Sequence, residues 1–440
     1  MLILNQSVGM WEYLMRIWNA RGLRKKILFS VFAIVIFRLL AHISVPGANL
    51  VALKEVFSRN SALGFFSALM GGSMENFSIV LMGLSPYINA SIIIQLLTVV
   101  IPRLEALSKE GARGYETINQ YTRWLTLPLA FVQSYGMVLL LNRLGGGQVL
   151  VDVKNLGVML PIMLSVTAGT VFLVWLGELM TEKGLGNGVS MLIFAGIVSS
   201  IPAVLGQTFS LALVESNKAV SFLILVGITL LLTAFIIWFT EGRRDIPITY
   251  ARQARGNESA IPIRVNQAGM IPIIFAISLV TFPNLFAQLF QDARSPWLAQ
   301  IAKFITSHFN PSSPGIIYVL IYFILVVAFS YFYVGVTFKT ENIAENIQKR
   351  GGFIPGIRPG RQTAEFLARV SQNLNLWGGI FLAMVAIFPY LFSYLTSEVG
   401  TGAVPLLISG AGLIIVVGVI LELVRQINTE LVMYDYEKFY

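Results

Sequence analysis

Long apolar segments recur along the whole chain. A helix that crosses a bilayer needs about 20 mostly apolar residues at ~1.5 Å rise per residue. Ten segments suit this length, and the pattern predicts spans at Ile27–Val45, Phe77–Ile101, Tyr121–Leu141, Gly157–Trp175, Val189–Leu205, Val220–Phe239, Ala268–Phe290, Ile316–Phe338, Leu374–Leu395 and Val404–Val424. The short alternating segments typical of a membrane β-barrel are not seen in the sequence. The pattern therefore predicts an all-α polytopic membrane protein.

One apolar stretch is too short to span. Leu63 to Met70 is apolar, Gly71-Gly72 follows at once, and the polar-studded second span comes next. About ten helical residues cover only ~15 Å, half of the ~30 Å hydrocarbon core. Such a piece can lie at membrane depth only where protein surrounds it or water fills a cavity. The pattern leaves two structures open, a re-entrant helix and a short helix on the outer surface.

Composition and charge predict how the chain is oriented in the membrane. The 440 residues are 56% hydrophobic and 12% charged, whereas soluble domains are roughly 45–50% apolar. With the N-terminus inside, the inner segments hold 23 of the 31 Lys and Arg residues and the outer segments hold 7. Basic residues favour the cytoplasmic side, so both termini are predicted to be cytoplasmic. Topology alone explains the net charge of +9, although this face would also suit acidic partners or RNA.

The first 26 residues predict an amphipathic segment at the membrane surface. Trp11, Tyr13 and Trp18 are the expected interfacial anchors. The segment lacks the basic region, apolar core and cleavage site of a secretory signal. The chain contains no Cys, which excludes disulfides and thiolate metal sites.

Two predicted inner loops stand out. They are Glu241–Gln267 and Lys339–Arg369, and each combines Arg, Pro and Gly in a long connection. Long loops of this kind are often functional. If they fold as hairpins or short helices, they project clear of the bilayer. Their charge fits either topology alone or a docking surface.

The sequence contains a short internal echo. GLSPYINAS begins at Gly83 and GMIPIIFAIS begins at Gly269, and both show G-x-x-P with an Ala seven residues after the Gly. Ten spans divide into five and five, and an odd number per half inverts the second copy. The echo therefore favours an inverted repeat, although two short matches among apolar helices also arise by chance.

The chain offers little for catalysis or ion coupling. The one acidic residue inside a predicted span is Glu422, near the cytoplasmic end of the last span, whereas a coupled transporter usually needs an acid at mid-membrane. His42 and His308 are isolated, so no metal cluster is expected, and there is no phosphate loop of the G-x-x-x-x-G-K-[ST] type. Gly184–Gly188 joins two spans and is better explained as a turn than as a nucleotide site. We expect no enzyme activity and no cofactor.

Five long motifs, in matching order over essentially the full length, resemble the SecY family (SecY/Sec61-alpha), the central channel subunits of the bacterial Sec protein translocase. They are PYINASIIIQLLTVV, SKEGARGYETINQYTR, WLGELMTEKGLGNGVSMLIFAGIV, VNQAGMIPIIFA and GGFIPGIRPGRQT, which begin at Pro86, Ser108, Trp175, Val265 and Gly351. The resemblance implies ten transmembrane helices as two inverted-repeat halves of five, with a short re-entrant plug helix.

The resemblance also implies boundaries. It gives a cytoplasmic amphipathic segment at 1–26, an N-terminal half at 27–206 and a C-terminal half at 207–424. The plug would be 61–72 and the cytoplasmic tail 425–440. The docking loops would be 241–267 and 339–369.

A pore closed at its waist by apolar side chains is implied as well. A purely apolar ring dewets when empty and offers no fixed partner to a passing chain. By resemblance the ring consists of Leu84, Ile88, Val189, Ile193, Ile274 and Ile415. The implied plug residues are Ser61, Leu63, Gly64, Phe65, Phe66, Leu69, Met70, Gly71 and Gly72.

Two further sites follow from the resemblance. A lateral gate between the second and seventh spans would involve Pro86, Ser91, Gln95, Asn266 and Pro272, with both prolines expected to loosen helix hydrogen bonding. A docking site for the ribosome and the SecA motor would involve Arg243, Arg244, Arg252, Arg255 and Arg358. The first loop is short, so the contacting arginine within it stays open.

The implied function is translocation of unfolded secretory proteins across the plasma membrane of a bacterium, with lateral release of transmembrane segments into lipid. The implied partners are SecE, SecG, the SecA ATPase, the translating ribosome (its RNA and protein), signal peptides with nascent or precursor polypeptides, and membrane lipids. The alternatives are a small-solute secondary transporter with inverted repeats, which needs a polar pocket at the midplane, and an intramembrane enzyme, which needs a catalytic constellation.

Overall fold

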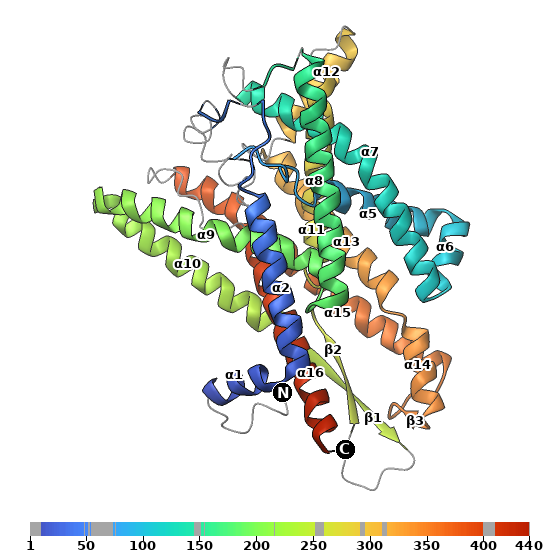
Figure 1. Cartoon of the computed structure of the whole chain (residues 1–440). Coiled ribbons are helices and arrows are strands. Elements are labelled where there is room, and N and C mark those ends of the chain that lie inside the picture. Colours follow the sequence, from blue (N-terminus) through green and yellow to red (C-terminus); the bar gives the residue numbers. More distant parts are fainter. Residues whose placement is uncertain are drawn as a thin grey trace. The chain divides into compact units, whose positions relative to one another are not determined.

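The computed structural model (Figure 1) describes residues 10–47, 49–51, 53, 74, 76–144, 151–153, 155–214, 216–250, 259–290, 295–309, 315–398 and 410–439. The plug expected at 61–72 lies outside these residues, as do Arg252 and Arg255. The chain forms two compact units. Unit 1 comprises Met1–Val204, Phe282–Ser307 and Val419–Tyr440, and unit 2 comprises Leu205–Thr281 and His308–Gly418.

Helices dominate both units. Unit 1 contains α1 (Met10–Asn19), α2 (Arg21–Leu40), α5 (Ser85–Val100), α6 (Pro102–Lys109), α7 (Ala112–Leu144), α8 (Leu156–Lys183) and nearly all of α12 (Pro296–His308). Unit 2 contains α10 (Ser216–Glu241), β1 (Arg243–Tyr250), β2 (Ser259–Arg264), α13 (Ile316–Thr337), α14 (Thr340–Lys349), β3 (Gly352–Phe353) and α15 (Arg361–Glu398). Three helices contribute to both units: α9 (Gly188–Val214), α11 (Ile271–Phe290) and α16 (Gly410–Phe439).

Each of the ten predicted spans contains a helix: α2, α5, α7, α8, α9, α10, α11, α13, α15 and α16. Among the described residues, seven helices are long and apolar enough to cross a membrane. An eighth is formed if α5 and α6, which bend by 101° at Ile101, count as one span. The chain is therefore a multi-pass α-helical membrane protein, as the hydropathy pattern predicts.

The core of unit 1 is the packing of α5, α7 and α8. Gly169 of α8 lies so close to the turns before α5 that a Cβ there would come 2.2 Å from the carbonyl oxygen of Ile79. Near the junction of α7 and α8, the Asn142 side chain donates to the carbonyl of Val151 at 2.7 Å and accepts from its amide at 2.9 Å. Close backbone approach and a doubly bonded amide thus fix this packing.

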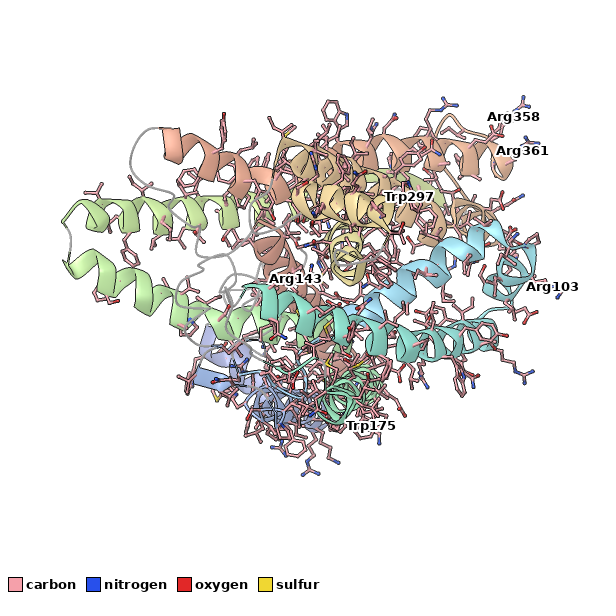
Figure 2. All side chains as sticks on the ribbon, turned by 90° about the horizontal axis from the view of Figure 1, so that it is seen from above. Arg103, Arg143, Trp175, Trp297, Arg358 and Arg361 are labelled. Atoms are coloured by element: carbon pink, nitrogen blue, oxygen red, sulfur yellow. The ribbon has the colours of Figure 1, made fainter. Side chains whose placement is uncertain are left out.

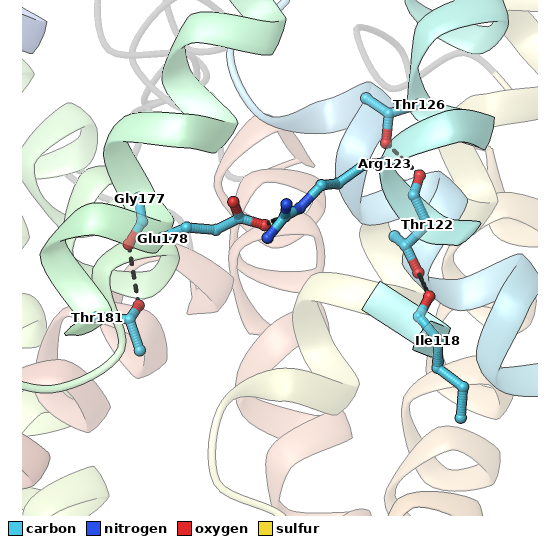
Figure 3. Close-up of polar contacts among 7 residues, drawn as sticks. All are labelled: Ile118, Thr122, Arg123, Thr126, Gly177, Glu178 and Thr181. Carbon is cyan, nitrogen blue, oxygen red and sulfur yellow. Dashed lines mark hydrogen bonds and ion pairs between the residues drawn. The ribbon is translucent and has the colours of Figure 1, made fainter. Parts of the chain in front are cut away.

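Several polar side chains of α7 and α8 bond within their own helix or across the pair (Figure 3). The Nε of Arg123 donates to Glu178 across the pair at 2.6 Å. Thr122 and Thr181 donate to carbonyls four residues back, at 3.0 and 2.9 Å. Such back-bonding lets hydroxyls enter an apolar helix without a partner elsewhere. The same two helices line a groove of about 890 Å³, formed by Leu127, Pro128, Phe131, Leu164, Thr167, Ala168, Val171, Phe172 and Trp175.

In unit 2, α13 packs along α15. Their buried contact includes a polar pair, in which Asn375 donates to the Ser330 carbonyl at 3.0 Å and accepts from its hydroxyl at 3.1 Å. Phe239 of α10 stacks on Phe381 of α15, with ring centroids 3.6 Å apart. These contacts join α10, α13 and α15 into one layer.

Candidate functional site

Two helices that carry predicted site residues begin in the same way. Gly83 and Gly269 have φ of +53° and +66°, and each stands two residues before the first residue of its helix, α5 or α11. Pro86 and Pro272 are the second residues of these helices. Only glycine adopts such φ values without strain. The G-x-x-P match is therefore a repeated local structure, in which a left-handed glycine stands two residues before a helix whose second residue is proline.

This placement corrects two expectations. The second span was expected to start at Phe77, but residues 78–84 form turns and a bridge, and α5 starts at Ser85. Pro86 and Pro272 were expected to loosen helix hydrogen bonding, and this is wrong. In the first turn of a helix the backbone amide has no intrahelical acceptor, so proline costs nothing there.

Two other helices also begin at close glycines. A Cβ at Gly188, the first residue of α9, would lie 2.0 Å from the Gly177 carbonyl oxygen. A Cβ at Gly410, the first residue of α16, would lie 1.9 Å from the Val385 carbonyl oxygen. Both helices therefore start against the backbone of the preceding apolar helix, where a side chain cannot fit.

Four of the six predicted ring residues occupy one position relative to Gly83, Gly188, Gly269 and Gly410, which we call the start glycines. Each lies five residues after a start glycine, and they are Ile88, Ile193, Ile274 and Ile415. The other two, Leu84 and Val189, directly follow Gly83 and Gly188. The sequence analysis did not find that the starts of α9 and α16 also match each other. Their shared spacing, Gly188–Ile193–Gly196 and Gly410–Ile415–Gly418, could have revealed this second match.

The ring residues differ in exposure. Leu84, Ile274 and Ile415 are buried, at 6%, 7% and 3% exposure, whereas Ile88, Val189 and Ile193 are half-buried. Leu84, Ile88, Val189 and Ile193 belong to unit 1, and Ile274 and Ile415 belong to unit 2. Every side chain of the set is apolar, so none offers a charged or hydrogen-bonding site.

The predicted gate residues bond within their own segments. The Nε2 of Gln95 donates to the Ser91 hydroxyl one turn away, at 3.3 Å. The Oδ1 of Asn266 accepts from the Gly269 amide at 2.9 Å. Each interaction lies inside one unit. Neither of these two bonds therefore reaches another helix.

The two inner loops form one sheet. β1 and β2, from the first loop, pair as an antiparallel hairpin that runs from Arg243 opposite Arg264 to Ile248 opposite Ser259. β3, from the second loop, joins the other edge of β1. An apolar cluster packs these strands with α14 and the start of α15, and it contains Ile246, Ile248, Ile263, Ile347, Ile354, Leu367 and Val370.

Arginines stand on the rim of this layer. Arg243 lies opposite Arg264 in the hairpin, and its Nε is 3.4 Å from Asp245. The turn that carries Arg358 lies between Gly356 and Gly360, whose φ values are +83° and +97°. Figure 2 shows the Arg358 and Arg361 side chains extending away from the ribbon. Both loops of this sheet thus carry exposed arginines.

The apolar helices of spanning length define a multi-pass α-helical membrane protein. The SecY family model matches residues 78–424. Protein translocase subunit SecY of Streptomyces galbus is 38% identical over 96% of this chain and 98% of its own length. The same subunit from Corynebacterium glutamicum is 39% identical over 94% and 96%. The chain belongs to the SecY family.

Solved structures agree on the fold. The structure of a protein conducting channel aligns with a TM-score of 0.67 at 16% identity, covering 93% of both chains. A SecY structure whose plug domain stabilises the closed state of the channel gives 0.67 at 18% with the same coverage. Sec61 in the canine ribosome–channel complex gives 0.64 at 16%, again over 93% of both. Because the family consists of translocase subunits, the chain is not an enzyme.

Proposed function

We propose that the chain is the central pore-forming subunit of a protein-conducting channel. It translocates unfolded secretory proteins across the plasma membrane of a bacterium and releases transmembrane segments laterally into lipid. The observation that carries the proposal is the repeated helix start, in which a close or left-handed glycine is followed after five residues by an isoleucine at α5, α9, α11 and α16. Family membership and the fold of the solved channels support the same function.

The repeat supports ten transmembrane helices in two inverted halves of five, residues 27–206 and 207–424. Among the ten, α5 and α9 are second and fifth, and α11 and α16 are second and fifth of the second set. Equivalent helix starts at equivalent places are what an inverted repeat requires. Segment 1–26 and the tail 425–440 then lie in the cytoplasm with both termini.

The waist of the pore is an apolar ring of Leu84, Ile88, Val189, Ile193, Ile274 and Ile415. Such a ring expels water when empty and holds no passing side chain strongly. The repeat extends it, because Met270 and Ala411 directly follow their start glycines as Leu84 and Val189 do. The plug at 61–72 seals the ring from outside, which its length supports.

The lateral gate lies between α5 and α11. An apolar segment leaves through it because apolar surface is more stable in lipid than in water. Ser91 and Gln95 bond each other, and Asn266 bonds the start of its own helix. Opening therefore breaks none of these bonds, which suits a seam that must part repeatedly. Pro86 and Pro272 set where each gate helix begins.

The basic surface formed by the two inner loops is the docking site for the translating ribosome and the SecA ATPase. Arg358 is its principal contact, with Arg243, Arg244, Arg252 and Arg255 beside it. A shared sheet lets one partner engage both loops. The Sec61 relative occurs in a ribosome–channel complex, which supports a ribosome partner here. SecE, SecG, signal peptides and precursor polypeptides complete the assembly.

Disulfide crosslinking tests the function, because the chain has no Cys. Ile274→Cys is combined with a secretory precursor that carries one Cys and is jammed in passage by a folded tail. After oxidation we expect a mixed disulfide that depends on SecA and ATP. Leu230→Cys is the control, since the Leu230 side chain on α10 is 66% exposed.

Ile193→Cys and Ile415→Cys extend the test to two other helix starts. A crosslink at all three positions, without one at Leu230→Cys, places the precursor in the ring. If jamming is verified and none of the three crosslinks, the precursor travels elsewhere. The ring would then be wrong, and the small-solute transporter would become the better explanation.

A further inference from the structure

Helix α1 has a broad apolar face and a narrow polar side. At 100° per residue, Tyr13, Ile17 and Ala20 lie on one flank of the apolar face, and Trp11, Met15 and Trp18 lie on the opposite flank. The positions of Met10 and Leu14 fall between the two flanks, and the polar side consists of Glu12, Arg16 and Asn19. The two flanks are far enough apart around the helix to face different environments.

The first side is covered by the protein. Ile17 and Ala20 belong to an apolar cluster with α2, the α8–α9 turn and α16, which includes Leu23, Leu185, Leu423 and Ile427. The Tyr13 hydroxyl donates to Oδ1 of Asn428 at 2.7 Å. Tyr13 was expected to be an interfacial anchor, and the structure instead docks it on α16.

The opposite side is exposed. Trp11, Met15 and Trp18, spaced by four and three residues, are 73%, 48% and 56% exposed. Two tryptophans and a methionine in a row are costly in water, because their apolar area stays hydrated. Tryptophan is also a residue typical of the membrane–water boundary.

Cations lie on α1 and on the first turns of α2, next to this exposed side in sequence. Arg16, Arg21 and Lys25 are exposed, and the guanidinium carbon of Arg24 lies 5.9 Å from the centre of the Trp18 ring. Lys26, by contrast, is paired with Glu430 of α16. The contact of Arg24 with Trp18 joins the apolar side to the first turn of α2.

The orientation of α1 suits a surface. Ala20 has φ −75° and ψ 98°, so the chain is extended between α1 and α2. Figure 1 shows α1 lying crosswise to α2 and to the end of α16. Since α2 fills a predicted span, a crosswise helix at its start runs along the bilayer rather than through it.

We propose that α1 is a binding surface for anionic phospholipid. Trp11, Met15 and Trp18 enter the boundary between headgroups and acyl chains, and Arg16, Arg21, Arg24 and Lys25 bind lipid phosphate. Cations close to an anionic leaflet strengthen binding, and an aromatic stripe gives it depth. Docking on α16 holds α1 in position, so the bound lipid stabilises the junction of the two chain ends.

The test uses Met15→Cys in the whole protein, labelled with an environment-sensitive fluorophore and reconstituted in nanodiscs. Glu12→Cys, on the polar side of α1, is the matched control. We expect a blue shift and quenching by spin-labelled lipid at Met15→Cys but not at Glu12→Cys. The shift should grow as phosphatidylglycerol replaces phosphatidylcholine.

A charge variant isolates the phosphate contacts. In R16Q/R21Q/R24Q/K25Q, half-maximal shift should need more phosphatidylglycerol, with about fivefold weaker binding at low salt for each charge removed. If Met15→Cys is not quenched in any lipid, protein covers the stripe and the proposal falls. If quenching is the same in both lipids and in the charge variant, binding to anionic lipid is refuted.

Discussion

The starts of α5 and α11 share one backbone geometry, but different groups accept the hydrogen bond of the glycine amide. In both, a left-handed glycine precedes the helix and its amide needs an acceptor three residues back. At Gly83 the acceptor is the backbone carbonyl of Val80, at 2.9 Å, and at Gly269 it is the side chain of Asn266, also at 2.9 Å. Turns precede α5, so a carbonyl is available there, whereas α11 follows the strand β2. The comparison shows that the geometry is repeated although the residues that build it differ.

The largest effect is expected at the starts of α9 and α16. Gly188→Ala and Gly410→Ala place a Cβ at 2.0 and 1.9 Å from a backbone carbonyl oxygen. Neither oxygen can move without shifting its helix, so we expect about 3 kcal/mol of destabilisation for each. Thermal unfolding of the purified protein measures it.

Gly206→Ala and Gly227→Ala are the controls, because a Cβ at either position meets nothing within 4 Å. There alanine should stabilise the helix by up to about 1 kcal/mol. Equal loss at Gly188 and Gly410 supports the repeat. A large loss of stability at only one of the two positions would show that the starts of α9 and α16 are not equivalent.

A smaller loss of stability is expected at Gly83 and Gly269, where the left-handed backbone conformation favours glycine. Gly83→Ala and Gly269→Ala force a Cβ into left-handed backbone, which costs about 1–2 kcal/mol. A Cβ at Gly269 would meet open space, so strain is the whole effect there. Asparagine tolerates this region better than alanine. Melting temperatures that rank Gly above Asn above Ala would agree, and an unchanged value for Ala would show that the backbone adjusts.

Much of this organisation could be predicted from hydropathy. Each predicted span contains a helix because apolar helices of spanning length are a strong local signal. The start of α5 was misplaced because Phe77, Val80 and Leu81 are as apolar as a span, although they are buried in turns. Hydropathy reports burial and not backbone conformation, so it could not distinguish buried turns from the first turns of a spanning helix.

The joining of the two inner loops could not be predicted. β1 pairs with β3 through Thr249 and Phe353, which are far apart in sequence. A two-residue strand has no periodic pattern of its own. Likewise, the pattern showed that α1 is amphipathic, but it takes the contacts of Tyr13, Ile17 and Ala20 in the structure to reveal which side docks.

The different acceptors at the starts of α5 and α11 predict a third effect. Asn266→Ala removes the acceptor of the Gly269 amide, and Asn266 is only 8% exposed. Leaving that amide without its partner should cost about 1 kcal/mol. Chemical unfolding measures the loss, with Asn266→Asp as the variant that keeps an acceptor. Equal stability of the alanine and aspartate variants would show that the side-chain bond contributes nothing.

The smallest effect on stability is expected for Gln95→Leu. The bond from Gln95 to Ser91 is long, at 3.3 Å, and lies on one half-buried helix face. Leucine keeps the volume and helix propensity, so the free energy of unfolding should change by less than about 0.5 kcal/mol. Any change in sorting would then reflect the proposed gate rather than a loss of stability. We expect precursors with weakened signal sequences to be exported differently by Gln95→Leu than by the parent chain. Unchanged export at unchanged stability would remove Gln95 from the proposed gate, whereas the proposed apolar ring depends on none of these bonds and would not be affected by that result.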